Sequence, residues 1–220
     1  MSRKLIAAMF TSLDGVIQAP GGPEEDPTQG FQYGGWGATH WDEAMGEYMG
    51  EGFASPFDLL LGRRTYEIFA AHWPFTEEEP AGLFNSITKY VATSEAGPLA
   101  WQNSVRLEGD VPQAVARLKE GDGPDLLTQG SAVLVRSLLA AGLVDELSLI
   151  TFPVLLGHGK RWYGEDATAG EWELINGRTS TTGVFMGRYR PTGPVRIGDF
   201  QLAEPSDAET ARREKMKAEG

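Results

Sequence analysis

Three short segments place small, hydroxyl-bearing or cationic residues directly after a predicted strand. They are Gly62-Arg63-Arg64-Thr65, Thr93-Ser94 and Gly130-Ser131. Guanidinium groups bind phosphate oxygens in pairs, and a glycine lets an anion approach the backbone closely. Taken singly, each segment is more often an ordinary turn or helix cap. Together, after successive strands, they indicate one extended anionic ligand such as a dinucleotide.

The usual fingerprints for such a ligand are absent from the sequence. Gly157 and Gly159 begin a G-x-G-x-x-G pattern, but Trp162 stands where its third glycine belongs. The sequence has no G-x-x-x-x-G-K-[ST] segment either. A dinucleotide-binding Rossmann dehydrogenase and a P-loop nucleotide hydrolase are therefore both disfavoured.

Composition excludes several other classes of protein. The net charge of −12 argues against a nucleic-acid binder and against a polybasic membrane surface, since both need a basic face. With no cysteine there is no thiol chemistry, and His40, His72 and His158 lack the spacing of metal ligands, so we expect no metal site. The apolar run Leu5–Phe10 is short for a signal peptide. We expect a cytoplasmic protein.

The elements that position the three segments alternate between strand and helix along the 220 residues. Predicted strands cover 3–10, 57–61, 89–93, 105–107, 126–128 and 144–152. Predicted helices cover 41–52, 64–72, 110–120 and 131–141, the last two capped by Asp110 and Ser131. This order predicts an α/β fold with a mostly parallel sheet and helices on both faces. Segments 172–180 and 184–189 predict a closing antiparallel hairpin.

A long loop over residues 18–40 interrupts this alternation. It is rich in glycine, proline and acidic residues, and loops of this length are usually functional or mobile. The aromatic residues of this loop, together with the tryptophan that directly follows it, either form a lid over a planar substrate or pack as part of the core. These aromatic residues are Phe31, Tyr33, Trp36 and Trp41.

Four segments, in order between residues 3 and 190, resemble the dihydrofolate reductase-like superfamily. They are "SLDGVI", "LLLGRRTYE", "QGSAVLVRSLLAAGLVDELSLITFPVLLGHGKRWYG" and "GVFMGRYRP". The branch they resemble most contains the reductase domain of bacterial riboflavin biosynthesis. The resemblance implies a three-layer α/β/α domain over residues 1–192. Residues 193–220 are then a charged extension, and its highly charged last stretch, 204–220, is either a solvated helix or a frayed tail.

The resemblance also implies that the three segments hold NADPH. Arg63 and Thr65 would meet its phosphates, Thr93 and Ser94 would lie near the adenosine 2′-phosphate, and Ile17 would lie near the nicotinamide. Charge-assisted partners at the 2′-phosphate favour NADPH over NADH. The predicted cofactor residues are Ile17, Gly62, Arg63, Thr65, Thr93, Ser94, Gly130, Ser131, Ala132, Val133 and Leu134.

The substrate side is less clearly marked. Asp14 follows the first strand within "SLDG" and either acts in catalysis or holds its turn through a local hydrogen bond. Dihydrofolate reductases place a carboxylate on the helix after the first long loop, but the pattern around Asp42, Glu43 and Glu47 does not match it. Lys160 and Arg161 either meet a substrate phosphate or are surface cations.

The resemblance implies hydride transfer from NADPH to a carbonyl or imine carbon of a small heterocyclic substrate. In the riboflavin branch that substrate is 5-amino-6-(5-phosphoribosylamino)uracil. Two alternatives stay open, a non-catalytic nucleotide-binding dimer on the same scaffold and a dihydrofolate or pterin reductase. Many members of the family pair through their terminal strands, so we expect a homodimer formed by residues 144–152 and the final hairpin.

Overall fold

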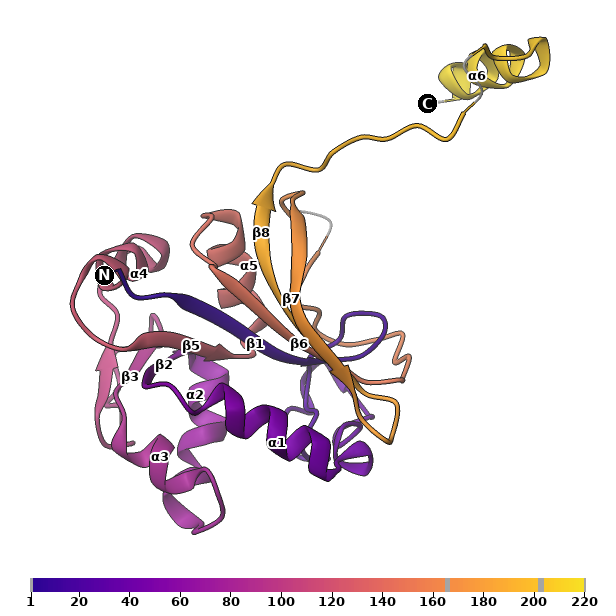
Figure 1. Cartoon of the computed structure of the whole chain (residues 1–220). Helices are drawn as coiled ribbons and strands as arrows, with labels where there is room; N and C mark the ends of the chain where they lie inside the picture. The colour runs from indigo at the N-terminus through magenta and orange to yellow at the C-terminus, as the bar shows by residue number, and fades with distance from the viewer. Residues whose placement is uncertain (1, 165–166, 202–203, 220) are drawn as a thin grey trace.

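The structure is a computed structural model that describes residues 2–164, 167–201 and 204–219. Within this part of the chain, one eight-stranded sheet runs in the order β4-β3-β2-β5-β1-β6-β8-β7 (Figure 1). The strands are β1 (Leu5–Thr11), β2 (Phe57–Gly62), β3 (Lys89–Ala92), β4 (Ser104–Arg106), β5 (Asp125–Gln129), β6 (Glu146–Thr151), β7 (Glu171–Thr179) and β8 (Phe185–Gly193).

The sheet has a parallel part and an antiparallel part. The pairs from β4 to β6 are all parallel, whereas β8 runs antiparallel to both β6 and β7. The continuously apolar β2 lies inside the parallel part, and its first five residues are buried, as expected for a strand covered on both faces. The predicted α/β class, with a mostly parallel sheet and a C-terminal antiparallel hairpin, is confirmed.

Helices form a layer on each face of the sheet (Figure 1). One layer holds α4 (Val111–Glu120) and α5 (Ala132–Ala140), and the other holds α1 (Glu43–Gly52), α2 (Arg63–Ala70) and α3 (Ala81–Ser86). Short 3-10 helices lie at Thr28–Gly30, Ala38–His40 and Trp73–Phe75. The predicted cap of α4 is confirmed, because the Asp110 carboxylate accepts a hydrogen bond of 3.1 Å from the Gln113 amide.

The two faces are packed differently. Under α4 and α5 the core is one continuous cluster that includes Val115 and Leu138. On the opposite face it is divided. Met45 of α1 belongs to one cluster and Phe84 of α3 to another. Between these two clusters, the side chains of β1 are covered only in part, Ala8 among them. This division of the core leaves room for a cleft.

Helix α3 was not expected from the sequence. It has only six residues, contains Gly82, and has no side-chain cap at its start, so its local signal is weak. Tertiary contacts hold it instead. Phe84 is buried, and the Lys89 ammonium on β3 donates to the carbonyls of Phe84, Asn85 and Ile87 at 2.8 to 3.1 Å.

The chain beyond β8 leaves the body of the domain and carries a last helix, α6 (Asp207–Glu219) (Figure 1). Of the two predicted forms of this charged extension, the structure shows the helix. The division into 1–192 and 193–220 stays a prediction. Among the described residues, no helix combines the length and the apolarity needed to cross a membrane.

Candidate functional site

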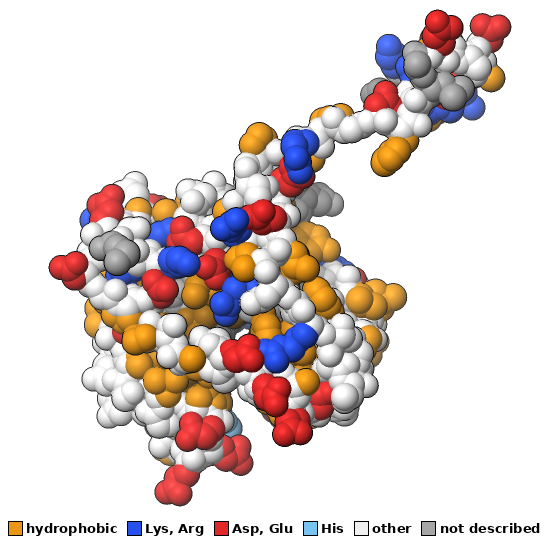
Figure 2. All heavy atoms as spheres, viewed as in Figure 1, with side chains coloured by type: hydrophobic (Ala, Val, Ile, Leu, Met, Phe, Trp, Pro, Cys, Tyr) orange, Lys and Arg blue, Asp and Glu red, His pale blue; other side chains and the backbone are white. Residues whose placement is uncertain are grey.

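A cleft of about 1830 Å³ opens on the face of the sheet where the core is divided. Ile6 and Ala8 of β1 lie at its floor, with α1 on one side and α2 and α3 on the other. Figure 2 shows this hollow between two lobes, with acidic side chains on both lips. Single-ligand pockets usually occupy roughly 300–1,000 Å³. The cleft therefore has room for a cofactor and a substrate together.

All eleven predicted cofactor residues line this one cleft. The three segments follow β3, β2 and β5, which are neighbours in the sheet and run parallel. Their carboxyl ends therefore meet at one edge, where open α/β sheets commonly bind ligands. Ile17 reaches the cleft from the loop after β1. The structure thus brings together every residue of the predicted set.

The turns after β2 and β5 are interlocked by Ser131. Its hydroxyl accepts a hydrogen bond of 2.9 Å from the Gly62 amide and donates one of 2.7 Å to the Thr65 hydroxyl. A Cβ on Gly62 would lie 2.7 Å from the Ser131 Oγ, closer than real Cβ atoms approach. Gly62 is required for this reason, while Ser131 itself adopts a left-handed conformation with φ of 64° that is costly for serine.

The predicted cap of α5 by Ser131 is wrong. The serine side chain makes no cap hydrogen bond, because its hydroxyl is used between Gly62 and Thr65. Helix α2 begins after Gly62 and has no side-chain cap either. Free amides in the first turn of a helix attract anions. Two uncapped helix starts therefore adjoin the same cleft.

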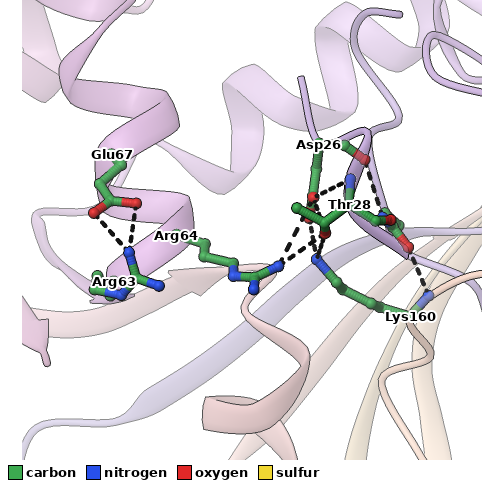
Figure 3. Close-up of polar contacts among 7 residues, drawn as sticks. Asp26, Thr28, Arg63, Arg64, Glu67 and Lys160 are labelled. Atoms are coloured by element: carbon green, nitrogen blue, oxygen red, sulfur yellow. Dashed lines mark hydrogen bonds and ion pairs between the residues drawn. The ribbon is translucent and has the colours of Figure 1, made fainter. Parts of the chain in front are cut away.

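Arg63 is the cation nearest to the turn after β2, and two glutamates engage it. Its guanidinium donates to Glu67 at 2.9 and 3.0 Å (Figure 3) and lies 3.2 Å from Glu95. The hydrogen bond and charge of Glu67, followed by the charge of Glu95, raise the pKa of Arg63. Both glutamate side chains are more than half exposed. Exposed ion pairs contribute little, so a phosphate could displace them at small cost.

A second polar group, the loop clasp, joins the long loop to the opposite side of the cleft (Figure 3). It consists of Asp26, Thr28, Arg64 and Lys160. Lys160 pairs with Asp26 and donates to the Thr28 hydroxyl at 2.7 Å, and Arg64 donates to the same hydroxyl at 2.9 Å. Burial alone would raise the pKa of Asp26, but the hydrogen bonds from Lys160 and Thr28 lower it. The clasp was not predicted, because nothing local in the sequence relates these residues.

Asp14 is engaged entirely by the protein itself. Its carboxylate accepts hydrogen bonds from Ser12 at 2.7 Å, from the amides of Leu156 and Gly157 at 3.1 and 2.9 Å, and from Arg161 at 2.9 Å. Burial would raise its pKa, but these donors outweigh burial and hold the pKa well below its usual range. Asp14 does not line the cleft. This geometry favours the turn-holding role over catalysis.

The predicted lid aromatics have different positions. Phe31 and Trp36 are buried in the core cluster under α1, as in the packing alternative. Tyr33 and Trp41 are both about half exposed, and of the two only Trp41 lines the cleft. Only Trp41 is therefore placed to contact a ligand there.

The carboxylates of the region before and within α1 do not reach the cleft. Asp42 caps α1 by accepting from the Met45 amide at 3.0 Å and also binds Thr181. Glu43 and Glu47 do not line the cleft either. The same end of the cleft is instead lined by Tyr48, Ser148 and Arg188. Sequence reasoning missed these three, since they lie on α1, β6 and β8 and share no motif.

Among the residues that the structure describes, no group of histidine, aspartate and glutamate side chains is arranged to hold a metal ion. The polar groups around the Gly62 and Gly130 turns are hydroxyls, a guanidinium and helix-start amides, which suit phosphate rather than metal.

Comparison with known proteins gives one family match. The model of the RibD C-terminal domain family matches residues 3–186, most of the chain. The Bacillus subtilis (strain 168) protein YyaP, itself uncharacterized, is 26% identical over 201 residues, which cover 87% of this chain and 96% of YyaP.

Two solved structures share the fold at low sequence identity. A provisionally named riboflavin biosynthesis protein from Shewanella sp. PV-4 is 19% identical, with a TM-score of 0.60, covering 87% of this chain and 99% of that one. Dihydrofolate reductase from Enterococcus faecalis, solved with NADP(H) and RAB-propyl, is 16% identical, with a TM-score of 0.55 and the same coverage. The predicted dihydrofolate reductase-like fold is confirmed by these likenesses.

Proposed function

The chain belongs to the RibD C-terminal domain family, reductases of the riboflavin-biosynthesis type, and from this premise we propose that it is an NADPH-dependent reductase of a small heterocyclic compound. One observation carries the proposal. The cleft gathers all eleven predicted cofactor residues at the ends of three neighbouring parallel strands. Such an edge, with two uncapped helix starts, suits an extended phosphate-bearing ligand.

The residues present fit a nicotinamide dinucleotide. Helices α2 and α5 start at these turns, after Gly62 and Gly130, without a side-chain cap, so amides of their first turns are left for an anion. Gly130 adopts a left-handed φ of 80° that favours glycine. Thr65 and the starts of α2 and α5 would hold the pyrophosphate, and Ile17 would lie against the nicotinamide. When bound, NADPH would supply a hydride to an electrophilic carbon of the substrate.

The proposal includes a preference for NADPH over NADH. Arg63 stands beside the turn after β2, and Thr93 and Ser94 follow the neighbouring β3. A guanidinium with adjacent hydroxyls offers charge-assisted hydrogen bonds to a 2′-phosphate, which NADH lacks. Glu67 and Glu95 would have to release Arg63, and their exposure makes this inexpensive.

The substrate proposed from the family is a pyrimidine of the 5-amino-6-(5-phosphoribosylamino)uracil type. The cleft volume of about 1830 Å³ supports a second ligand beside the cofactor. Dihydrofolate or pterin reduction has less support, because no carboxylate from the α1 region lines the cleft among the residues described. We do not assign Asp14 as the proton donor of the reaction, because its carboxylate already accepts four hydrogen bonds from the protein.

Calorimetric titration with NADPH and NADH tests the proposal. We expect NADPH to bind more tightly, and Arg63→Ala to remove most of that preference while leaving NADH binding nearly unchanged. Arg117→Ala on α4, an exposed arginine on the opposite face of the sheet, is the matched control. Equal affinity of the wild-type protein for both dinucleotides would refute the 2′-phosphate assignment. The absence of binding would refute the cofactor.

A homodimer is proposed alongside the activity. Strand β7 is an edge strand, and its Leu174 and Ile175 are half exposed. Beside it, a second cavity of about 740 Å³ is lined by apolar residues that include Trp172 and Tyr189. Exposed apolar edges of this kind commonly mark interfaces. Light scattering during size-exclusion chromatography should give twice the chain mass, and a monomer at micromolar concentration would contradict the proposal.

A cytoplasmic location belongs to the same proposal, because reduced nicotinamide dinucleotides are supplied inside cells. Fractionation of the native host, followed with an antibody against the protein, tests it directly.

A further inference from the structure

The α1 end of the cleft differs chemically from the end that holds the cofactor residues. Three polar side chains line it, Tyr48 from α1, Ser148 from β6 and Arg188 from β8. Ser148 pairs in register with Ala8 of β1 on one side and with Arg188 on the other. Directly paired residues point to the same face of a sheet. Ser148 and Arg188 therefore lie side by side on the cleft floor, opposite Tyr48.

The two hydroxyls form a buried pair. The Tyr48 hydroxyl lies 3.1 Å from the Ser148 Oγ, and each residue is only 7% exposed. One hydrogen bond between two hydroxyls uses one of their two hydrogens. Neither hydroxyl has another partner among the described residues. Whichever hydroxyl donates within the pair, the other has a hydrogen left to donate to a ligand.

Arg188 brings positive charge that is only partly neutralised. Its Nε is buried without a hydrogen-bond partner among the described residues. The nearest carboxylate oxygen, on Glu146, lies at 3.7 Å, beyond hydrogen-bond distance. Glu146 is already bonded to the Lys4 ammonium at 2.9 Å. Glu146 is thus shared between Lys4 and Arg188, and it neutralises Arg188 only in part.

Among the described residues, no carboxylate lines this end of the cleft, since Glu146 lies behind Arg188 and is not part of the lining. The acidic residues that line the cleft are Glu25, Asp26 and Glu79. Glu25 accepts from backbone amides of its own loop, Asp26 belongs to the loop clasp, and Glu79 precedes α3. The α1 end therefore offers hydrogen-bond donors and positive charge, whereas a cationic aminopyrimidine requires a carboxylate acceptor.

We propose that Tyr48, Ser148 and Arg188 form a subsite for substrate oxygens, which selects a planar heterocycle bearing carbonyl and anionic oxygens over a cationic aminopyrimidine. This inference rests on the proposed function for the presence of a substrate in the cleft. The anionic oxygens belong either to a carboxylate on the ring or to a phosphate on its substituent. Both are bound by the same guanidinium chemistry.

Calorimetric titration without cofactor tests the subsite, with four probes. Orotate carries ring carbonyls and a carboxylate, uracil carries the carbonyls alone, ribose 5-phosphate carries the phosphate alone, and 2,4-diaminopyrimidine is the cationic counterpart. The variants are Arg188→Gln and Tyr48→Phe. Arg190→Gln is the matched control, because Arg190 lies two residues further along β8 and pairs with Glu173 outside the cleft.

We expect orotate or ribose 5-phosphate to bind more tightly than 2,4-diaminopyrimidine. Arg188→Gln should weaken binding of the anionic probe at least about tenfold, because a charge-assisted hydrogen bond is lost. Tyr48→Phe should weaken the binding of uracil and of orotate alike, by about threefold to tenfold. Arg190→Gln should leave the affinity for every probe unchanged. The probe that is most sensitive to Arg188→Gln identifies carboxylate or phosphate as the anion.

Three results would overturn the subsite: tighter binding of 2,4-diaminopyrimidine, no measurable binding of either anionic probe, or an equal response to Arg188→Gln and Arg190→Gln. If Arg188→Gln lowers the thermal midpoint below the working temperature, Arg188→Lys replaces it, since it keeps the charge and loses the planar guanidinium. The outcome is independent of NADPH binding. A protein that binds NADPH but prefers the cationic probe refutes the subsite and leaves the proposed function standing.

Discussion

Replacing Gly62 by alanine should disturb, through a single contact, the two turns to which we assign the cofactor phosphates. The backbone of Gly62, with φ of −75° and ψ of 159°, is one that alanine adopts freely, so backbone strain contributes nothing. The added methyl group would lie 2.7 Å from the Ser131 Oγ and 2.9 Å from the Ser131 Cβ. The next nearest atom, the Leu134 Cβ, is at an ordinary 3.8 Å. Ser131 must therefore move.

The cost follows from the hydrogen bonds that Ser131 then loses. Its bonds to the Gly62 amide and to the Thr65 hydroxyl measure 2.9 and 2.7 Å. Each such bond contributes about 0.5–1.5 kcal/mol, so Gly62→Ala should lower the free energy of unfolding by about 1–3 kcal/mol. The same movement displaces both turns, and we expect NADPH to bind at least about tenfold more weakly.

A double-mutant cycle with Ser131→Gly isolates this contact. Ser131→Gly removes both atoms of the clash and suits the left-handed backbone at that position. In the Ser131→Gly background, Gly62→Ala should leave the free energy of unfolding, measured with urea, nearly unchanged. An equal cost of Gly62→Ala in both backgrounds, or unchanged NADPH affinity in the single variant, would refute the interlocked turns as the basis of the site.

Three further predictions follow from other contacts. Glu95→Gln frees Arg63 from one of its two carboxylates and should tighten NADPH binding while NADH binding stays constant; weaker NADPH binding in calorimetry would show that Glu95 does not compete with the 2′-phosphate. Asp14→Asn should lower the free energy of unfolding by about 1–3 kcal/mol through lost hydrogen bonds, and a variant of unchanged stability without activity would restore the catalytic alternative. Burial lowers the pKa of Lys89 from 10.5 to about 8, so between these pH values the unfolded chain binds a proton that the folded chain has released, and stability should rise with pH. Urea unfolding of wild type and Lys89→Met should show this rise only in the wild type.

The sequence was sufficient to predict the part of the site that depends on strand order. Short apolar runs followed by helices predict parallel strands, and parallel strands bring their carboxyl ends together. For this reason Arg63, Thr93 and Ser131, far apart in the chain, were correctly expected at one edge. The side-chain use of Ser131 was not predictable, because an N-cap and a cross-turn hydrogen bond look alike in sequence.

The α1 end of the cleft could not be predicted, for a different physical reason. Tyr48, Ser148 and Arg188 meet only because β8 returns antiparallel to β6 and α1 crosses above them. Their pairing depends on the register of the sheet, which a single sequence does not fix. Helix α3 and the loop clasp likewise depend on tertiary contacts rather than on local propensity.

A crystal structure of the protein grown with NADPH tests the central claim most directly. We predict the pyrophosphate between the Gly62–Thr65 turn and the Gly130–Ser131 turn, with the 2′-phosphate on Arg63 in place of Glu95. A cleft without the dinucleotide at saturating concentration, or a dinucleotide whose phosphates lie away from these two turns, would contradict it.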